Sequence, residues 1–274
     1  MEAACGDVAR EFADKVVLVT GASAGIGKAT ALLFASRGAR LSLVAWDADA
    51  SALQAVGLQC RAYGHEPLLI HVDLSTDEGC ERTAKDTLAK FGRLDILVNN
   101  AGIGGCTTLE KTDMATFDRV FALNVRAVYN LTRLLAPALV RARGNVVNVS
   151  STAAEVACVG LLPYAMSKAA VSHFTRLIAL ELAPKGVRVN AVCPGVVDTN
   201  LVQRMTGITE EEYREWLRQA ERGIPLGRAC VGADVAAMIA HLAGAGAAAV
   251  TGATVPVDGG LRFMGAGALV PGQL

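Results

Sequence analysis

The feature that most constrains the fold is a regular alternation of short apolar runs with helical segments along the whole chain. The apolar runs are rich in β-branched residues and lack polar alternation, which indicates strands buried on both faces of a sheet. They cover residues 15–20, 40–46, 67–74, 94–102, 144–151, 186–195 and 251–260. The fold class predicted is therefore α/β, a doubly wound, seven-stranded parallel sheet with helices on both faces.

The chain reads as a single domain over residues 1–274, because no linker or change of composition divides it. With 52% hydrophobic residues, it can bury a sizeable core. The alternation breaks at about 199–232, where a charged amphipathic helix is inserted. Insertions at the carboxyl ends of strands build ligand sites in open α/β sheets, so we expect a substrate loop here. An ordinary surface helix is the alternative interpretation.

Composition excludes several functional classes. The formal net charge is zero and aromatic residues make up 5%, which argues against nucleic-acid and anionic-membrane partners. No apolar run approaches the roughly 20 residues of a membrane helix. The seven cysteines show no C-x-x-C spacing, so we expect buried thiols and no metal site. The charged N-terminal residues differ from a secretion signal, and we expect a cytoplasmic protein.

The glycine-rich stretch "TGASAGIG" (20–27) lies where the first strand becomes the first helix. Gly21 permits a tight turn, Gly25 lets backbone approach a pyrophosphate, and Gly27 lets the helix pack on the strand. The free N–H groups of the helix then hold phosphate. Glycines that only pack a helix on a sheet are the alternative, but the strand–turn–helix context favours a dinucleotide site.

A second constellation is Tyr164 and Lys168, which lie four residues apart on one helical face. A free phenol has a pKa near 10, and a nearby ammonium lowers it, which would suit acid–base catalysis near neutral pH. A snorkelling surface pair is the alternative. Ser151, thirteen positions upstream at a strand end, favours the catalytic interpretation because its hydroxyl can stabilise charge on a substrate oxygen. Its neighbour Ser150 is a rival for that role.

Several motifs together resemble the short-chain dehydrogenase/reductase family. They are the G-x-x-x-G-x-G turn, "NNAG" (99–102), "NVSS" (148–151), Tyr164, Lys168 and "VNAVCPG" (189–195). The resemblance runs from about residue 13 to 262, and the chain is similar to 3-oxoacyl-carrier-protein-reductase-like and hydroxysteroid-dehydrogenase-like members. It implies a Rossmann-type domain that transfers hydride between a nicotinamide dinucleotide and a secondary alcohol or ketone.

The resemblance also implies roles for individual residues. The catalytic residues would be Asn124, Ser151, Tyr164 and Lys168, with Ser150 a bystander. Asn124 would order a water beside Lys168, which also binds the nicotinamide ribose. The cofactor-binding residues would be Gly21, Ser23, Gly25, Ile26, Gly27, Trp46, Asp47, Asp73, Leu74, Asn100, Ala101, Gly102, Tyr164, Lys168, Pro194, Gly195, Val197 and Thr199. For Asp73, which would contact adenine, a helix N-cap is the alternative.

The choice between NAD(H) and NADP(H) is normally made at the end of the second strand. Family members that use NAD often have Asp where this chain has Ala45, and those that use NADP often have Arg where it has Trp46. Family members often have a basic residue directly before the middle glycine of the turn, and this chain has Ala24 there. Because a 2′-phosphate without cations is poorly held, NAD(H) is slightly favoured, with Asp47 as the acid. The basic side chains that could instead compensate are Lys28, Arg37 and Arg40.

The predicted substrate pocket is mostly small or apolar. It consists of Ser151, Ala153, Val156, Tyr164, Leu201 and Met205. We expect a secondary alcohol or ketone on a steroid-like, fatty-acid-derived or small cyclic skeleton. The family resemblance also implies a homotetramer, or a dimer, formed through 113–141, 163–183 and the last strand. The alternatives are an epimerase or dehydratase on the same scaffold, and a non-catalytic redox sensor that binds the dinucleotide.

Overall fold

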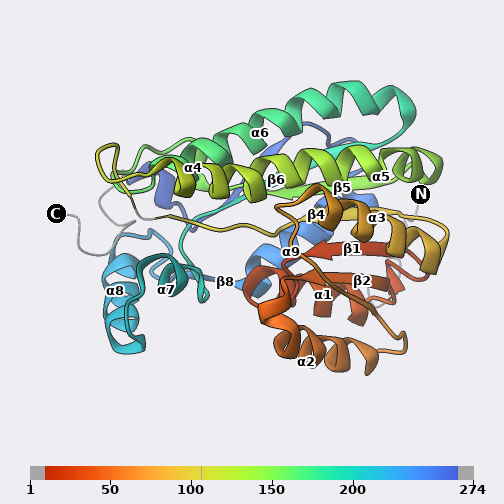
Figure 1. Cartoon of the computed structure of the whole chain (residues 1–274), viewed down its shortest axis with the longest axis horizontal. Coiled ribbons are helices and arrows are strands. Elements are labelled where there is room, and N and C mark those ends of the chain that lie inside the picture. The colour runs from red at the N-terminus through yellow and green to blue at the C-terminus, as the bar shows by residue number, and fades with distance from the viewer. Residues whose placement is uncertain (1–9, 106, 265–274) are drawn as a thin grey trace, which may run out of the picture.

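Alternating strands and helices build one parallel sheet with helices on both faces in this computed structural model, which describes residues 10–105 and 107–264 (Figure 1). The strands of the sheet are β1 (Val16–Thr20), β2 (Arg40–Ala45), β3 (Leu68–His71), β4 (Ile96–Asn99), β5 (Asn145–Val149), β6 (Arg188–Pro194) and β9 (Thr254–Val257). Their order is β3-β2-β1-β4-β5-β6-β9, and every pairing is parallel. The predicted seven-stranded, doubly wound fold is therefore confirmed.

Two layers of helices cover the sheet. The helices of the main body are α1 (Gly25–Ser36), α2 (Ala50–Arg61), α3 (Asp77–Phe91), α4 (Met114–Phe121), α5 (Val128–Ala142), α6 (Leu162–Leu182) and α9 (Gly232–Ala243). Helices α1, α2 and α9 bury one face, and α3, α5 and α6 bury the other. None of the helices in the described ranges is both long and apolar enough to span a membrane.

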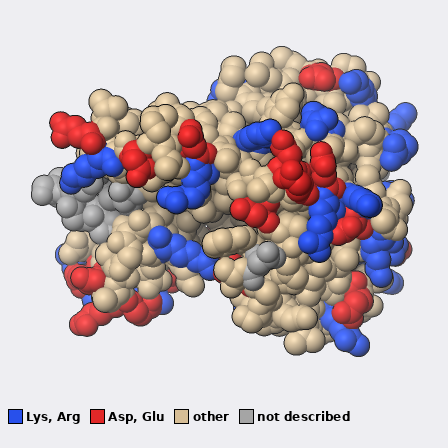
Figure 2. All heavy atoms as spheres, viewed as in Figure 1, with Lys and Arg blue, Asp and Glu red and all other residues tan. Residues whose placement is uncertain are grey.

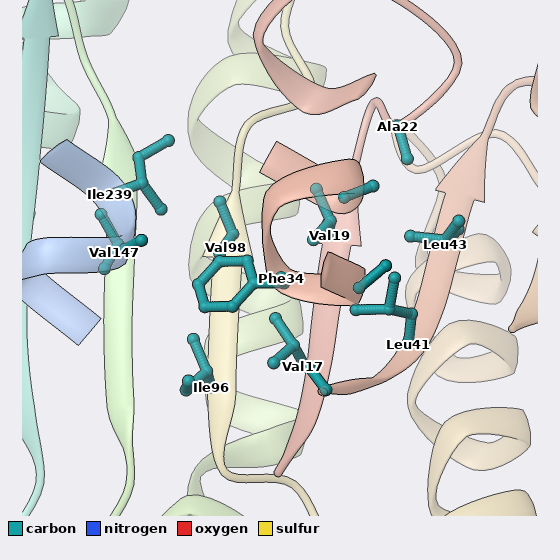
Figure 3. Close-up of a cluster of buried hydrophobic side chains, with 14 of the residues drawn as sticks. Val17, Val19, Ala22, Phe34, Leu41, Leu43, Ile96, Val98, Val147 and Ile239 are labelled. Atoms are coloured by element: carbon teal, nitrogen blue, oxygen red, sulfur yellow. The ribbon is translucent and has the colours of Figure 1, made fainter. Parts of the chain in front are cut away.

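The core explains why the strands read as continuous apolar runs. Successive β1 side chains point to opposite faces, so Val17 joins one hydrophobic cluster and Leu18 the other. Figure 3 shows Phe34 of α1 lying over β1 and β4, among Val19, Ile96 and Val98. Every residue of β1 is buried, and the strand is apolar from Val16 to Val19, with the polar Thr20 at its end.

Helix boundaries follow local chemistry. The Thr76 hydroxyl caps α3 by accepting from Gly79 N at 3.0 Å, and Gly92 ends that helix with a left-handed conformation. The interpretation of Asp73 as the N-cap is therefore wrong, because Asp73 Oδ1 instead accepts from Ser75 N at 2.8 Å. The predicted helix over 113–141 is α4 and α5, joined by a π-helical segment at Ala122–Ala127.

The inserted segment forms a separate lobe beyond the carboxyl ends of the strands (Figure 1). It consists of α7 (Leu201–Thr206) and α8 (Glu210–Arg222), flanked by the short paired strands β7 (Val197–Asp198) and β8 (Cys230–Val231). The sequence pattern did not predict this two-stranded sheet. Helix α8 has its own buried cluster, which includes Tyr213, Trp216 and Leu217. The lobe is therefore anchored by apolar packing as well as by the chain connections.

Candidate active site

The predicted site residues lie at the carboxyl ends of six neighbouring strands, where open parallel sheets bind ligands. The glycine turn follows β1, Asn100 and Gly102 follow β4, and Ser151 follows β5. Pro194 ends β6, and Gly195, Val197 and Thr199 come next along the chain. The remaining predicted residues lie after β2 and β3, in the π-helical segment, and in α6 and α7. The fold thus gathers residues that are more than 100 positions apart in the sequence.

The glycine turn is shaped for a close ligand approach. Gly21 and Gly25 have φ values of +65° and +52°, a region that residues with a Cβ rarely adopt. A Cβ on Gly27 would lie 2.1 Å from Gly21 O, so only glycine fits there. Ser23 is buried in the turn, and Ile26, in the first turn of α1, packs against the hydrophobic core. The open backbone and the N-terminus of α1 fit a dinucleotide pyrophosphate.

Thr20 and Asn100 fasten the glycine turn to the loop after β4. Thr20 Oγ1 accepts from the backbone N–H groups of Asn100 and Ala101, both at 2.9 Å. In return, Asn100 Nδ2 donates to Thr20 O at 2.8 Å. Sequence reasoning missed the role of Thr20, although its place directly before the first glycine was a usable signal. These bonds hold together two loops that would flank the cofactor.

Tyr164 and Lys168 both project from the first turns of α6. Lys168 is buried, its Nζ donates to Val149 O at 2.9 Å, and it lies 5.6 Å from the centroid of the Tyr164 ring. Burial lowers the pKa of Lys168 to about 8, while the nearby Cys193 acts in the opposite direction. Burial raises the pKa of Tyr164, and a hydrogen bond with Ser151 opposes that rise.

The structure therefore does not show the expected lowering of the Tyr164 pKa by Lys168. The ammonium faces the Tyr164 ring and is bonded to a carbonyl, so Ser151 is the group that favours the phenolate. The two serines are also distinguished by their contacts. Ser150 Oγ donates to Lys168 O at 2.9 Å and is 2.7 Å from Ser172 Oγ inside the protein. Only Ser151 of the two serines is hydrogen-bonded to Tyr164.

Asn124 lies in the π-helical segment and is fully buried. Such segments interrupt α-helices most often at functional sites. Its amide donates to Ile103 O at 2.8 Å and to Ser167 Oγ at 3.0 Å, and its carbonyl accepts from Ile103 N at 2.9 Å. A Cβ on Gly102 would lie 3.2 Å from Asn124 Oδ1 and 3.3 Å from Lys168 Nζ. Gly102 therefore lets both side chains approach the same backbone.

The residues after β2 and β3, which were predicted to bind the adenosine, differ from the expected arrangement. Trp46 follows β2 and is 61% exposed, and the side chain of Asp47 lies outside what the structure describes. Asp73 is exposed after β3, while the side chain of Leu74 packs into the core below the sheet. Asp49, which sequence reasoning missed, accepts from Ser23 Oγ at 3.3 Å and so lies against the glycine turn. Its acidic side chain just after the second strand was the signal that could have found it.

Thr199 before α7 and Met205 within it approach the loops that follow β1 and β4. Thr199 approaches the glycine turn, because a Cβ on Gly25 would lie 3.0 Å from Thr199 Cγ2. Met205 packs on the loop after β4, where a Cβ on Gly104 would lie 2.2 Å from its Sδ. The predicted pocket residues Ala153 and Val156 come after β5, and Leu201 starts α7. No cluster of metal-ligating side chains occurs among residues 10–105 and 107–264.

Comparisons with known proteins decide the family. A family model described as Enoyl-(Acyl carrier protein) reductase matches residues 21–262. The chain belongs to the short-chain dehydrogenase/reductase family. Oxidoreductases of this family bind NAD(P) in a Rossmann-type fold, and the predicted resemblance is confirmed.

Similar proteins in the short-chain dehydrogenase/reductase family match along nearly their whole length. A 3-oxoacyl-[acyl-carrier-protein] reductase of Thermotoga maritima is 37% identical, over 90% of this chain and 97% of its own. A meso-2,3-butanediol dehydrogenase of Serratia marcescens is 34% identical, over 91% and 95%. The solved structure of a short-chain dehydrogenase/reductase of unknown function from Caenorhabditis elegans, with cofactor, has a TM-score of 0.87. It is 32% identical and covers 92% of this chain and 97% of its own.

Proposed function

We propose that this protein is a nicotinamide-dependent dehydrogenase or reductase that interconverts a secondary alcohol and a ketone on an apolar skeleton. The observation that carries the proposal is the convergence of Ser151, Tyr164, Lys168 and Asn124 beside Gly102 in the loop after β4. The two curated relatives named above support it, since one is named for reducing a 3-oxoacyl group and the other for oxidising a diol. The apolar side chains predicted to line the pocket, Ala153, Val156, Leu201 and Met205, support the apolar skeleton.

The side chains have complementary tasks in this reaction. The nicotinamide, when bound, supplies or takes up the hydride. The Tyr164 phenol donates its proton to the carbonyl oxygen in reduction and takes it back in oxidation. The Ser151 hydroxyl donates to the same oxygen and stabilises the charge that develops there. Lys168, which donates to Val149 O, would hold the nicotinamide ribose and keep positive charge beside the phenol.

Asn124 positions the start of α6, which carries Tyr164 and Lys168. Its three hydrogen bonds join the π-helical segment to Ile103 in the loop after β4 and to Ser167 in α6. Because Ser167 is one residue from Lys168, Asn124 fixes the start of α6 against the loop that lines the groove. The predicted water beside Lys168 stays a prediction of the same proposal.

We also propose NAD(H) over NADP(H), a cytoplasmic location and a homotetramer. The face of the molecule in Figure 2 carries positive and negative side chains interspersed. This pattern supports a small-molecule partner rather than a nucleic acid. Large apolar side chains are exposed on the face made by α5 and α6. They are Tyr129, Met166, Leu177 and Leu180. Several large exposed apolar residues on one helical face are typical of a protein–protein interface.

The testing experiment has two stages. The purified protein is titrated separately with NADH and NADPH while nicotinamide fluorescence is followed. It is then assayed for turnover of secondary alcohols with the oxidised dinucleotide and of ketones with the reduced one. We expect binding, tighter for NADH, and turnover of apolar secondary alcohols or ketones. Binding without turnover of any alcohol or ketone would support the redox-sensor alternative, and binding of neither dinucleotide would overturn the proposal.

A further inference from the structure

An ion pair joins α7, which we call the lid helix, to the turn after β2, where the adenosine would lie. Arg204 Nη2 donates to Asp49 Oδ1 at 3.1 Å, and Arg204 Nη1 reaches Asp49 Oδ2 at 3.4 Å. The same Oδ2 accepts from Ser23 Oγ at 3.3 Å. The Asp49 side chain is 23% exposed and that of Arg204 is 57% exposed. The pair is therefore accessible to a ligand that enters along the glycine turn.

Asp49 lies where a Rossmann-type domain binds the adenosine ribose. Asp49 ends the 3₁₀ turn at Asp47–Asp49, just after β2, and its carboxylate is held against Ser23 of the glycine turn. In Rossmann-type domains the adenosine ribose lies between the end of the second strand and the glycine turn. An acidic residue about 20 positions beyond the turn accepts from the ribose hydroxyls, and an arginine there holds a 2′-phosphate. Here the acid and the arginine are both present, and they are paired with each other.

We propose that Asp49 and Arg204 together form the adenosine selector of this enzyme, with the acid supplied by the Rossmann domain and the cation by the lid. The Asp49 carboxylate accepts from the ribose hydroxyls of NAD(H). It rejects the 2′-phosphate of NADP(H) in two ways, by direct repulsion and by neutralising the guanidinium that would otherwise hold the phosphate. This inference rests on the proposed dinucleotide function, and it identifies the source of the NAD(H) preference.

The residues at the end of β2 leave room for this arrangement. Ala45 and Trp46, where family members often have the selecting residue, offer neither a carboxylate nor a cation. Arg204 is adjacent to Met205, which packs on the loop after β4, so one turn of α7 touches both ends of the groove. The contact between residues 49 and 204 also ties the lid to the cofactor site across 155 positions of sequence.

The test is a set of four proteins: wild type, Asp49→Asn, Arg204→Gln and the double variant. Dissociation constants for NADH and NADPH are measured by nicotinamide fluorescence, which does not depend on turnover. In Asp49→Asn we expect NADH binding to weaken about tenfold and NADPH binding to tighten about tenfold, each about 1.4 kcal/mol. The double variant should not bind NADPH more tightly than the wild type, because the tighter binding in Asp49→Asn comes from the freed Arg204 guanidinium. Arg204→Gln alone should keep the preference for NADH.

The structure offers suitable controls. The Asp49 side chain makes no capping bond to α2, so Asp49→Asn should fold normally, as thermal unfolding will show. The exposed pair Arg126–Asp77 joins the π-helical segment to α3 on the other face of the sheet. Asp77→Asn and Arg126→Gln remove charges of the same kind and should leave both dissociation constants unchanged.

Two outcomes would overturn the inference. One is a double variant that binds NADPH as tightly as Asp49→Asn does, because the cation would then lie elsewhere. The other is an Asp49→Asn variant whose two affinities change equally or not at all. Failure of the proposed function is distinguishable from both, since the wild type would then bind neither dinucleotide.

Discussion

Burial shifts the pKa values of Tyr164 and Lys168, both on α6, in opposite directions. It disfavours the phenolate of Tyr164, whose pKa rises, and the ammonium of Lys168, whose pKa falls to about 8. Burial thus biases both residues toward their neutral forms. Ser151 is the hydrogen-bonding partner that opposes the bias on the phenol. The proton donor for carbonyl reduction, a neutral phenol, is therefore the resting form.

Tyr164→Phe tests the proton-transfer role at the scale of one atom. Removal of the hydroxyl should lower turnover by about 10²–10⁴-fold, the usual contribution of general acid–base catalysis. Affinity for NADH should change little, because the glycine turn holds the pyrophosphate. Steady-state kinetics and a fluorescence titration measure the two effects on the same sample.

Tyr63→Phe is the matched control, since Tyr63 is exposed just beyond α2, which covers the other face of the sheet from α6. It loses the same atom and should keep full turnover. Retention of turnover in Tyr164→Phe would show that another group delivers the proton.

The lowered pKa of Lys168 predicts a pH dependence of cofactor affinity. Below about pH 8 the buried amine is an ammonium that donates to the ribose, and above it the charge is lost. Affinity for the dinucleotide should therefore fall as pH rises through about 8, by up to about tenfold per pH unit. Fluorescence titrations at pH values on both sides of this pKa measure the step. Lys168→Met should bind more weakly and show no such step; the same step in that variant would assign it to another group.

At the scale of secondary-structure elements, the buried Tyr213 of α8 anchors the segment that leads into α7. The Tyr213 hydroxyl donates to Asp198 Oδ1 at 2.9 Å and accepts from Thr199 N at 3.2 Å. Burial raises the pKa of Tyr213, and the bond to Asp198 raises it further, so the hydroxyl stays protonated as a donor. Helix α8 thereby fixes the segment in which Thr199 approaches the glycine turn.

Tyr213→Phe should loosen the lid while keeping its apolar packing. Loss of the hydroxyl leaves Thr199 N without this partner, which costs about 1–3 kcal/mol of unfolding free energy. Affinity for the dinucleotide should fall as well, because the segment over Gly25 loses an anchor. Denaturant unfolding and fluorescence titration measure the two effects.

Tyr63→Phe provides the comparison, since Tyr63 is exposed at the end of α2 and should tolerate the change. If Tyr213→Phe matched it in both stability and affinity, α8 would have no part in holding the cofactor.

Sequence periodicity located the main elements because their signals are local. The predicted strands and the helix over 77–91 follow from apolar runs and capping residues, and α3 spans those residues. Two features escaped. The π-helical segment arises where Asn124 bonds across to Ile103 and Ser167, which are distant in sequence. The β7–β8 pair is short and depends on the chain returning after α8.

At the scale of the whole molecule, the site exists because a parallel sheet brings many strand ends to one edge. Motif spacing alone could therefore place the glycine turn, Ser151, Tyr164 and Lys168 together. The pairing of Asp49 with Arg204 could not be predicted from spacing, because it depends on how the lid lobe sits on the domain. Selection at the adenosine end is thus a property of the assembled fold rather than of one motif.

The exposed apolar face of α5 and α6 predicts assembly. Leu177 and Leu180 on α6 are 54% and 78% exposed, and Tyr129 of α5 lies beside Phe174 with ring centroids 5.8 Å apart. A second chain packed on this face would remove their apolar surface from water, at about 25 cal/mol per Å². The wild type should therefore have about four times the 28.4 kDa chain mass in solution. Sedimentation velocity measures that mass.

A double variant, Leu177→Glu with Leu180→Glu, should fall to a mass of one or two chains, because carboxylates buried at the interface would be unpaired. Leu58→Glu is the matched control: Leu58 is 67% exposed on α2, which covers the other face of the sheet. That variant should keep the wild-type mass. A wild type that sediments as a monomer, or a double variant that stays a tetramer, would show that α5 and α6 are not the interface.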